Sequence, residues 1–195
     1  MKINTKTLAG TAILAALVVV FDYTLKYSNL KIPFPWLPYL KFDFTGIPVV
    51  LSFLFFGLIP GTFTSVIASV AILARSGDVI GSSMKGIAEF STILGMAIGL
   101  KLFKRFRIVG SSVFGVASRV LIMVCINFLL IYAGILSIST TYADIPITFA
   151  LLLGFFNMIQ GMISIVGGYS IYEAIRRRAP SLVKKITGDK HTALE

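Results

Sequence analysis

The chain has 195 residues, of which 56% are hydrophobic and only 13% are charged, and its mean hydropathy is +0.91. This composition excludes an ordinary soluble domain and is typical of a polytopic membrane protein. The net charge of +10 could indicate nucleic-acid binding, but the basic residues lie between and after apolar segments, as in the cytoplasmic loops of membrane proteins. We therefore expect a multi-pass protein of the cell membrane that does not bind nucleic acid.

Taken in chain order, the apolar segments predict an all-α bundle of six transmembrane helices that forms a single domain, 1–195. The predicted helices cover residues 7–25, 44–58, 61–74, 82–103, 109–135 and 147–175. The second and third of them are joined at Pro60-Gly61, and this Pro-Gly pair predicts a tight turn.

The connection between the first two predicted helices, residues 26–43, contains Pro33, Pro35 and Pro38 and cannot be a regular helix. It also carries Trp36, the only Trp of the chain, and Trp is enriched at the membrane–water interface. We expect an ordered extracellular loop that covers the outer half of the bundle.

Six spans place both termini on the same side of the membrane, and the charges indicate which side. If both termini are cytoplasmic, twelve Lys and Arg residues lie inside and five lie outside, in agreement with the positive-inside rule. The tail 176–195 is then cytoplasmic, and the connections 26–43, 76–81 and 136–144 are extracellular.

Sequence signals for catalysis are nearly absent. His191, the only histidine, lies in the tail, and the chain has no zinc-ligand spacing, nucleophile–base arrangement or phosphate-binding glycine loop. We therefore expect no enzymatic activity, no metal site and no cofactor. The lone Cys125 lies in an apolar segment, which predicts a packing role.

Polar side chains within the predicted spans indicate either a ligand site or contacts between helices. Asn157 and Gln160 are three residues apart and share a helix face, and Asn127 lies at a comparable depth in the preceding helix. Such amides line a cavity or hydrogen-bond to neighbouring helices. Glu89 and Arg119 lie at depths that permit an ion pair, which would either fix the helix register or contact a ligand.

Three motifs carry a resemblance to a known family: Ala12-x-x-x-Ala16, the run LKFDFTGIP at 40–48 and the run FNMIQG at 156–161. Together with the size and the six predicted spans, they resemble the substrate-binding S component of energy-coupling factor (ECF) vitamin transporters, most closely the riboflavin-specific members. The resemblance extends over the whole chain.

The resemblance implies a subunit that captures a vitamin from outside and then associates with a membrane scaffold subunit and two cytoplasmic ATPase subunits. The first helix would contact the scaffold through Ala9, Ala12 and Ala16. The expected ligand is riboflavin, because aromatic side chains and amides suit a flat heterocycle. The predicted substrate-binding residues are Trp36, Lys41, Phe42, Asp43, Glu89, Asn127, Asn157 and Gln160.

Two positions depart from the riboflavin-specific pattern, which usually has Lys where this chain has Gln160 and an acid where it has Gly46. Loss of an ammonium removes a charge-assisted contact worth roughly 1.5–3 kcal/mol. Another water-soluble vitamin is therefore an alternative ligand. A stand-alone ion-coupled secondary transporter is the alternative from a different class, with Glu89 and Arg119 as its only plausible ion site.

Overall fold

The computed structural model describes residues 5–103, 105–135, 146–181 and 183. The predicted connection 136–144, and His191 with most of the tail, lie outside the described residues. A two-stranded antiparallel hairpin, β1 (Ile32–Phe34) and β2 (Leu37–Phe42), follows the first helix. The described helices are α1 (Thr5–Tyr27), α2 (Gly46–Phe56), α3 (Leu58–Ser76), α4 (Val79–Leu102), α5 (Arg107–Tyr132) and α6 (Pro146–Arg178).

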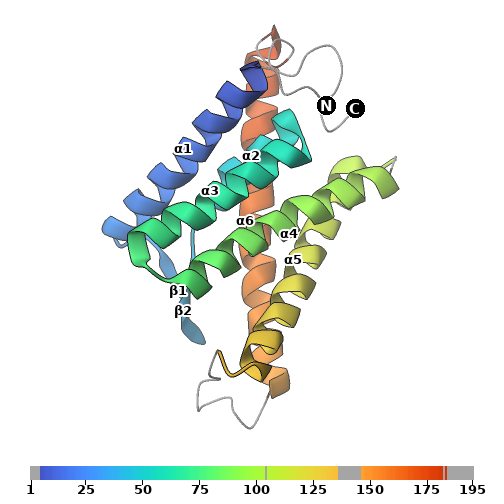
Figure 1. Ribbon diagram of the computed structural model, residues 1–195. Helices are drawn as coiled ribbons and strands as arrows, with labels where there is room; N and C mark the ends of the chain where they lie inside the picture. Colours follow the sequence, from blue (N-terminus) through green and yellow to red (C-terminus); the bar gives the residue numbers. More distant parts are fainter. Residues whose placement is uncertain (1–4, 104, 136–145, 182, 184–195) are drawn as a thin grey trace.

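Helix α6 runs along the whole length of the molecule and packs mainly against α2 and α5 (Figure 1). The beginning of α1 and the end of α6 lie at one end of the molecule, whereas the hairpin, the α3–α4 connection and the end of α5 lie at the other. The short helix α2 is almost entirely buried, and its Val50 and Leu54 form the core with Ile93 of α4 and Ile165 of α6. This core holds α2, α4 and α6 together.

Helix α2 ends and α3 begins at Gly57, so the turn predicted at Pro60-Gly61 is wrong. Gly57 has a φ of 92°, in the region that favours glycine. Pro60 instead lies in the first turn of α3, where the missing N–H of proline leaves no hydrogen bond unmade. The helix break therefore needs a single residue.

Helices α4 and α5 approach each other closely because glycines face the contact. A Cβ atom at Gly95 would lie 2.3 Å from the carbonyl oxygen of Phe114, and one at Gly99 would lie 2.5 Å from that of Gly110. Backbone atoms cannot move aside as flexible side-chain ends do, so larger residues would force the helices apart. The close approach brings the side chains of α4 against those of α5.

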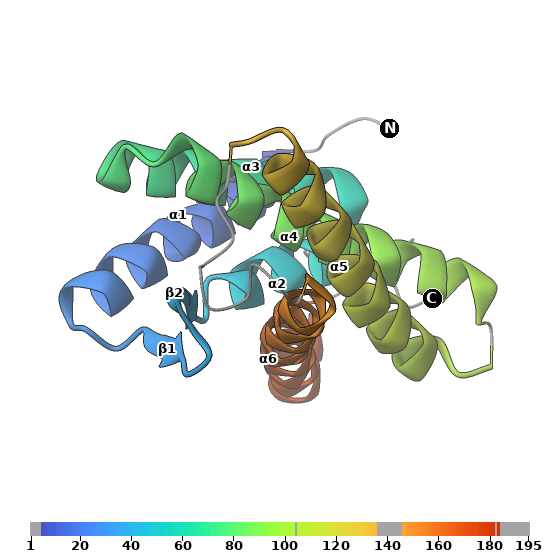
Figure 2. The ribbon, with the colours of Figure 1, turned by 90° about the horizontal axis from the view of Figure 1, so that it is seen from below.

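The hairpin occupies most of the segment that was predicted to be an irregular loop. Phe34 of β1 and Leu37 of β2 are buried with Phe156 of α6. The ring centroid of Phe156 lies 4.9 Å from that of Phe42 and 5.6 Å from that of Phe34. Figure 2, from below, shows the hairpin between the end of α1 and α6. Aromatic contacts thus hold the hairpin against α6.

By length and composition, four of the described helices can cross a membrane, namely α1, α3, α5 and α6, while α2 is apolar but shorter. Large apolar side chains cover the outside of α1, α3 and α5. Cys125, for which we expected a packing role, is exposed on α5. The chain is therefore a multi-pass membrane protein, and its described residues are mainly helical apart from the hairpin and the short connections.

Candidate functional site

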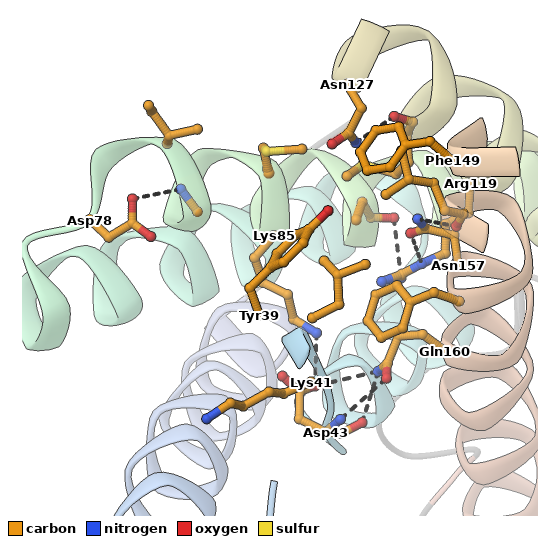
Figure 3. Close-up of a pocket in the computed structure, with 18 of the residues that line it drawn as sticks. Tyr39, Lys41, Asp43, Asp78, Lys85, Arg119, Asn127, Phe149, Asn157 and Gln160 are labelled. Carbon is orange, nitrogen blue, oxygen red and sulfur yellow. Dashed lines mark hydrogen bonds and ion pairs between the residues drawn. The ribbon is translucent and has the colours of Figure 1, made fainter. Parts of the chain in front are cut away.

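A cavity of about 490 Å³ lies where the hairpin meets α4, α5 and α6 (Figure 3). Pockets of about 300–1,000 Å³ commonly hold small organic ligands. The apolar part of its wall includes Met84, Met123, Phe149, Leu153 and Phe156. The polar and charged part consists of Tyr39, Lys41, Asp43, Asp78, Lys85, Arg119, Asn127, Asn157 and Gln160.

Arg119 of α5 is a charged residue in the cavity wall, although only 1% of its surface is exposed. Its Nη1 lies 3.1 Å from Glu89 Oε1, 3.1 Å from Thr92 Oγ1 and 3.4 Å from the carbonyl oxygen of Ala88. Its Nε donates to Asn157 Oδ1 at 3.3 Å. The ion pair that the depths of Glu89 and Arg119 permit is thus present and joins α4 to α5, and the hydrogen bond to Asn157 extends the contact to α6.

Lys85 is a second cation in the wall, one helical turn before Glu89. Its Nζ lies 2.9 Å from Glu89 Oε1 and 2.8 Å from Asp43 Oδ1. Glu89 therefore neutralises part of the charge of both Lys85 and Arg119, and Lys85 ties α4 to the segment that follows the hairpin.

Asp43 and Gln160 join the end of the hairpin to α6. Gln160 Nε2 donates to the carbonyl oxygen of Asp43 at 2.8 Å, and the backbone N–H of Asp43 donates to Gln160 Oε1 at 3.2 Å. Burial favours the neutral acid, but the ammonium groups of Lys85 and Lys31 outweigh it and hold the pKa of Asp43 below its ordinary value. The amide and the carboxylate together anchor the hairpin over the cavity.

Asn127 and Asn157 each donate one hydrogen bond to a backbone carbonyl oxygen of their own helix. Asn127 Nδ2 donates to the carbonyl oxygen of Met123 at 2.7 Å, and Asn157 Nδ2 donates to that of Leu153 at 2.9 Å. These i to i−4 hydrogen bonds fix the side chains, and both residues lie in the cavity wall.

A further group of charges continues from this wall to α1. Asp22 of α1 is fully buried and pairs with Lys31, and Arg75 Nε of α3 lies 2.7 Å from Asp22 Oδ2. Lys31 Nζ also lies 3.9 Å from Asp43 Oδ2. An unbroken series of ion pairs therefore joins α3 and α1 to the cavity.

The structure brings together five of the eight residues predicted to bind substrate, and the other three lie outside the cavity wall. The five that line it are Lys41, Asp43, Asn127, Asn157 and Gln160. Glu89 lies behind the wall, where it holds Lys85 and Arg119. Phe42 packs on Phe156, and Trp36 is exposed on the hairpin beside Phe34.

Sequence reasoning did not assign Lys85 to the site. The signal was present, because Lys85 and Glu89 are four residues apart and therefore neighbours on one helix face. Tyr39, Phe149 and Phe156 were also missed; Phe156 opens the run FNMIQG, but nothing in the pattern distinguishes Tyr39 and Phe149 from other aromatic residues of the chain.

The two departures from the family pattern lie beside charges supplied by α4. A Cβ atom at Gly46 would lie 2.1 Å from Ser164 Oγ and 2.5 Å from Glu89 Oε2, so Ser164 and the Glu89 carboxylate together fill the space where a side chain at position 46 would begin. Lys85 Nζ and Gln160 Nε2 both contact Asp43 Oδ1, at 2.8 and 3.4 Å. The Glu89 carboxylate thus lies beside position 46, and the Lys85 ammonium lies near position 160. Both groups are supplied by α4.

The alanines predicted to contact a scaffold lie away from the cavity. Ala9, Ala12 and Ala16 are all exposed on α1, next to the exposed apolar side chains of Leu8 and Ile13.

Comparison with known proteins agrees with this architecture. No family model matches the chain. The chain is 31% identical over 147 residues to the riboflavin transporter FmnP of Bacillus subtilis (strain 168), a match that covers 69% of this chain and 76% of that protein. Its fold is similar to the solved S component of a bacterial ECF transporter, with a TM-score of 0.72, 21% identity, and coverage of 88% of this chain and 96% of that one. The chain therefore belongs to the family of the riboflavin transporter FmnP, and it has the fold of the S component of an ECF transporter.

Proposed function

We propose that this protein is a riboflavin-binding S component, which takes the vitamin from outside the cell and has no catalytic activity of its own. The observation that carries the proposal is the cavity of about 490 Å³, in which aromatic and apolar side chains face a row of amides and cations. A flat tricyclic ring with polar groups at one end and a polar chain suits such a lining.

The orientation that we propose places six spans in the membrane with both termini in the cytoplasm. The excess of Lys and Arg in the cytoplasmic segments, twelve against five, supports this orientation. The hairpin, the α3–α4 connection and the cavity then face the outside, where the vitamin arrives.

Uptake also requires partners in this proposal. The exposed alanine face of α1, formed by Ala9, Ala12 and Ala16, would pack against a membrane scaffold subunit, and two cytoplasmic ATPase subunits would drive transport. Small side chains let helices approach closely, which is how such contacts gain packing energy within lipid.

Titration of the purified chain with riboflavin tests the proposal. We expect nanomolar-class binding, and we expect Asn157→Ala to weaken it by about tenfold, because removal of the amide leaves buried polar partners unsatisfied, which costs roughly 1–3 kcal/mol. Asn29→Gly is the matched control, since Asn29 lies on the α1–β1 connection with a φ of 54° that glycine adopts readily.

A titration that is silent for riboflavin would refute the proposal. The presence of Gln160 at a position where riboflavin-specific members usually have Lys makes another water-soluble vitamin the second candidate. Titration of the same sample with a panel of such vitamins separates the two, because only the true ligand should bind tightly and protect the chain from thermal unfolding.

A further inference from the structure

Arg119 uses only part of its guanidinium group on the protein. Its Nη1 and Nε contact Glu89, Thr92, Ala88 and Asn157. The other terminal nitrogen, Nη2, has no hydrogen-bond partner among the described residues, although Arg119 is 99% buried, with 1% of its surface exposed, and lines the cavity. Two N–H donors of a buried cation therefore remain for whatever occupies the cavity.

The position of these donors is fixed by the surrounding contacts. Nη1 is held by Glu89 and Thr92 from α4, and Nε is held by Asn157 from α6. Figure 3 shows the side chains of Arg119 and Asn157 side by side in the cavity wall. Because the guanidinium group is planar and two of its nitrogens are held, the N–H groups of the third nitrogen point in a fixed direction. Binding a ligand atom there therefore costs little side-chain entropy.

The other polar side chains near this part of the wall are more fully engaged. Both ends of the Gln160 amide are used on the backbone of Asp43, at 2.8 and 3.2 Å. Lys85 spends two of its N–H donors on Asp43 and Glu89. Glu89 Oε1 is shared between Lys85 and Arg119, and Lys85 also has Asp43, so Arg119 has no carboxylate of its own among the described residues. An electron-rich acceptor on the ligand would complete this arrangement.

We propose that Arg119 determines ligand specificity by donating from Nη2 to a conjugated carbonyl oxygen at one edge of the bound ring. This inference rests on the proposed riboflavin-binding function. In riboflavin only the pyrimidine end of the ring carries carbonyl oxygens, and the opposite end carries methyl groups. The carbonyl end of the ring therefore lies against Arg119, between α4 and α6, and the methyl-bearing end lies away from it.

Riboflavin analogues in which one or the other ring carbonyl oxygen is replaced by sulfur test this assignment, because sulfur is a weaker hydrogen-bond acceptor. The wild-type chain should bind one of the two analogues at least about tenfold more weakly than riboflavin. In Arg119→Gln riboflavin itself should bind at least about tenfold more weakly, and the difference between riboflavin and that analogue should disappear. A direct contact predicts that Arg119→Gln no longer distinguishes riboflavin from the sulfur analogue. A merely structural role would weaken the binding of both ligands and leave the difference between them unchanged.

Lys85→Gln is the matched control, because Lys85 lies in the same wall and pairs with the same Glu89 oxygen. It should keep the discrimination between riboflavin and the analogue. In Arg119→Gln the Glu89 carboxylate keeps Lys85 as its partner, so no unpaired buried charge is created. If Arg119→Gln does not fold, Arg119→Lys replaces it with the same expected loss of discrimination, since Lys has no planar fork of donors.

The outcomes separate this inference from the proposed function. Riboflavin binding with the same discrimination in wild type and in the Arg119 variant would overturn the inference and leave the proposed function standing. A wild-type chain that does not bind riboflavin would overturn both.

Discussion

At the scale of single residues, Asp43 has the most connected carboxylate of the site. It accepts from Lys85 Nζ at 2.8 Å and from Thr45 Oγ1 at 2.7 Å, and Lys31 lies 3.9 Å away. Asp43→Asn removes the negative charge while Glu89 continues to hold Lys85. We expect this change to lower the free energy of unfolding by about 1–3 kcal/mol at neutral pH. Thermal unfolding in detergent, followed by helical circular dichroism, measures the effect.

The same carboxylate predicts a pH dependence. Because the pKa of Asp43 is lowered in the folded chain, its ionised form contributes stability above the ordinary aspartate pKa of about 3.9, and this contribution is lost as the pH falls through the lower folded value. The difference in Tm between wild type and Asp43→Asn should therefore shrink on acidification. Asp78→Asn is the control, because exposed Asp78 caps α4 through Gly81 N at 2.9 Å and Asn caps equally well. A Tm difference that is constant with pH would contradict the prediction.

At the scale of elements, the α4–α5 contact depends on glycine. A Cβ atom at Gly95 would meet the Phe114 carbonyl oxygen at 2.3 Å, whereas a Cβ atom at Gly154 of α6 would meet Val120 Cγ1 at an ordinary 3.5 Å. Gly95→Ala should therefore destabilise the chain by about 1–3 kcal/mol. Gly154→Ala should be neutral or slightly stabilising, since alanine favours helix by roughly 0.5–1 kcal/mol. Equal shifts in Tm for the two variants would rule out the close contact as the cause.

The membrane class and the family could be predicted from the sequence, because spanning lipid demands long apolar segments and because the motifs around Asp43 and Asn157 are specific. The hairpin could not be predicted in this way. Its strands contain Pro33 and Pro38, and its position depends on contacts between Phe42 and Phe156, which are far apart in the chain. Local patterns carry no information about such pairs.

The candidate site could likewise be predicted only in part from the sequence. Asn157 and Gln160 could be assigned to one helix face from their spacing alone. The distance between α4 and α5 determines which N–H groups of Arg119 hydrogen-bond to the protein. That distance is set by packing at glycines and not by the spacing of charged residues in the sequence. The role of Lys85 similarly becomes visible only when the hairpin places Asp43 beside it.

At the scale of the whole molecule, the surfaces that we propose for the ligand and for the scaffold subunit lie apart. The exposed alanines of α1 do not line the cavity. The double substitution Ala12→Leu with Ala16→Leu should therefore leave riboflavin affinity within about twofold of wild type, but it should abolish co-purification with a scaffold subunit and lower uptake by cells, because bulky side chains keep helices apart. The matched control is Ala117→Leu on the exposed face of α5, which should alter neither property. Loss of riboflavin affinity in the α1 variant would contradict the separation.

The hairpin also gives the molecule an internal optical probe. Trp36 is the only tryptophan of the chain, and its ring lies 5.1 Å from that of Phe34, which in turn contacts Phe156 in the cavity wall. Its fluorescence therefore has a single source close to the cavity. A flavin bound there would accept excitation energy from this indole, so occupancy and any displacement of the hairpin can be followed in the unlabelled protein.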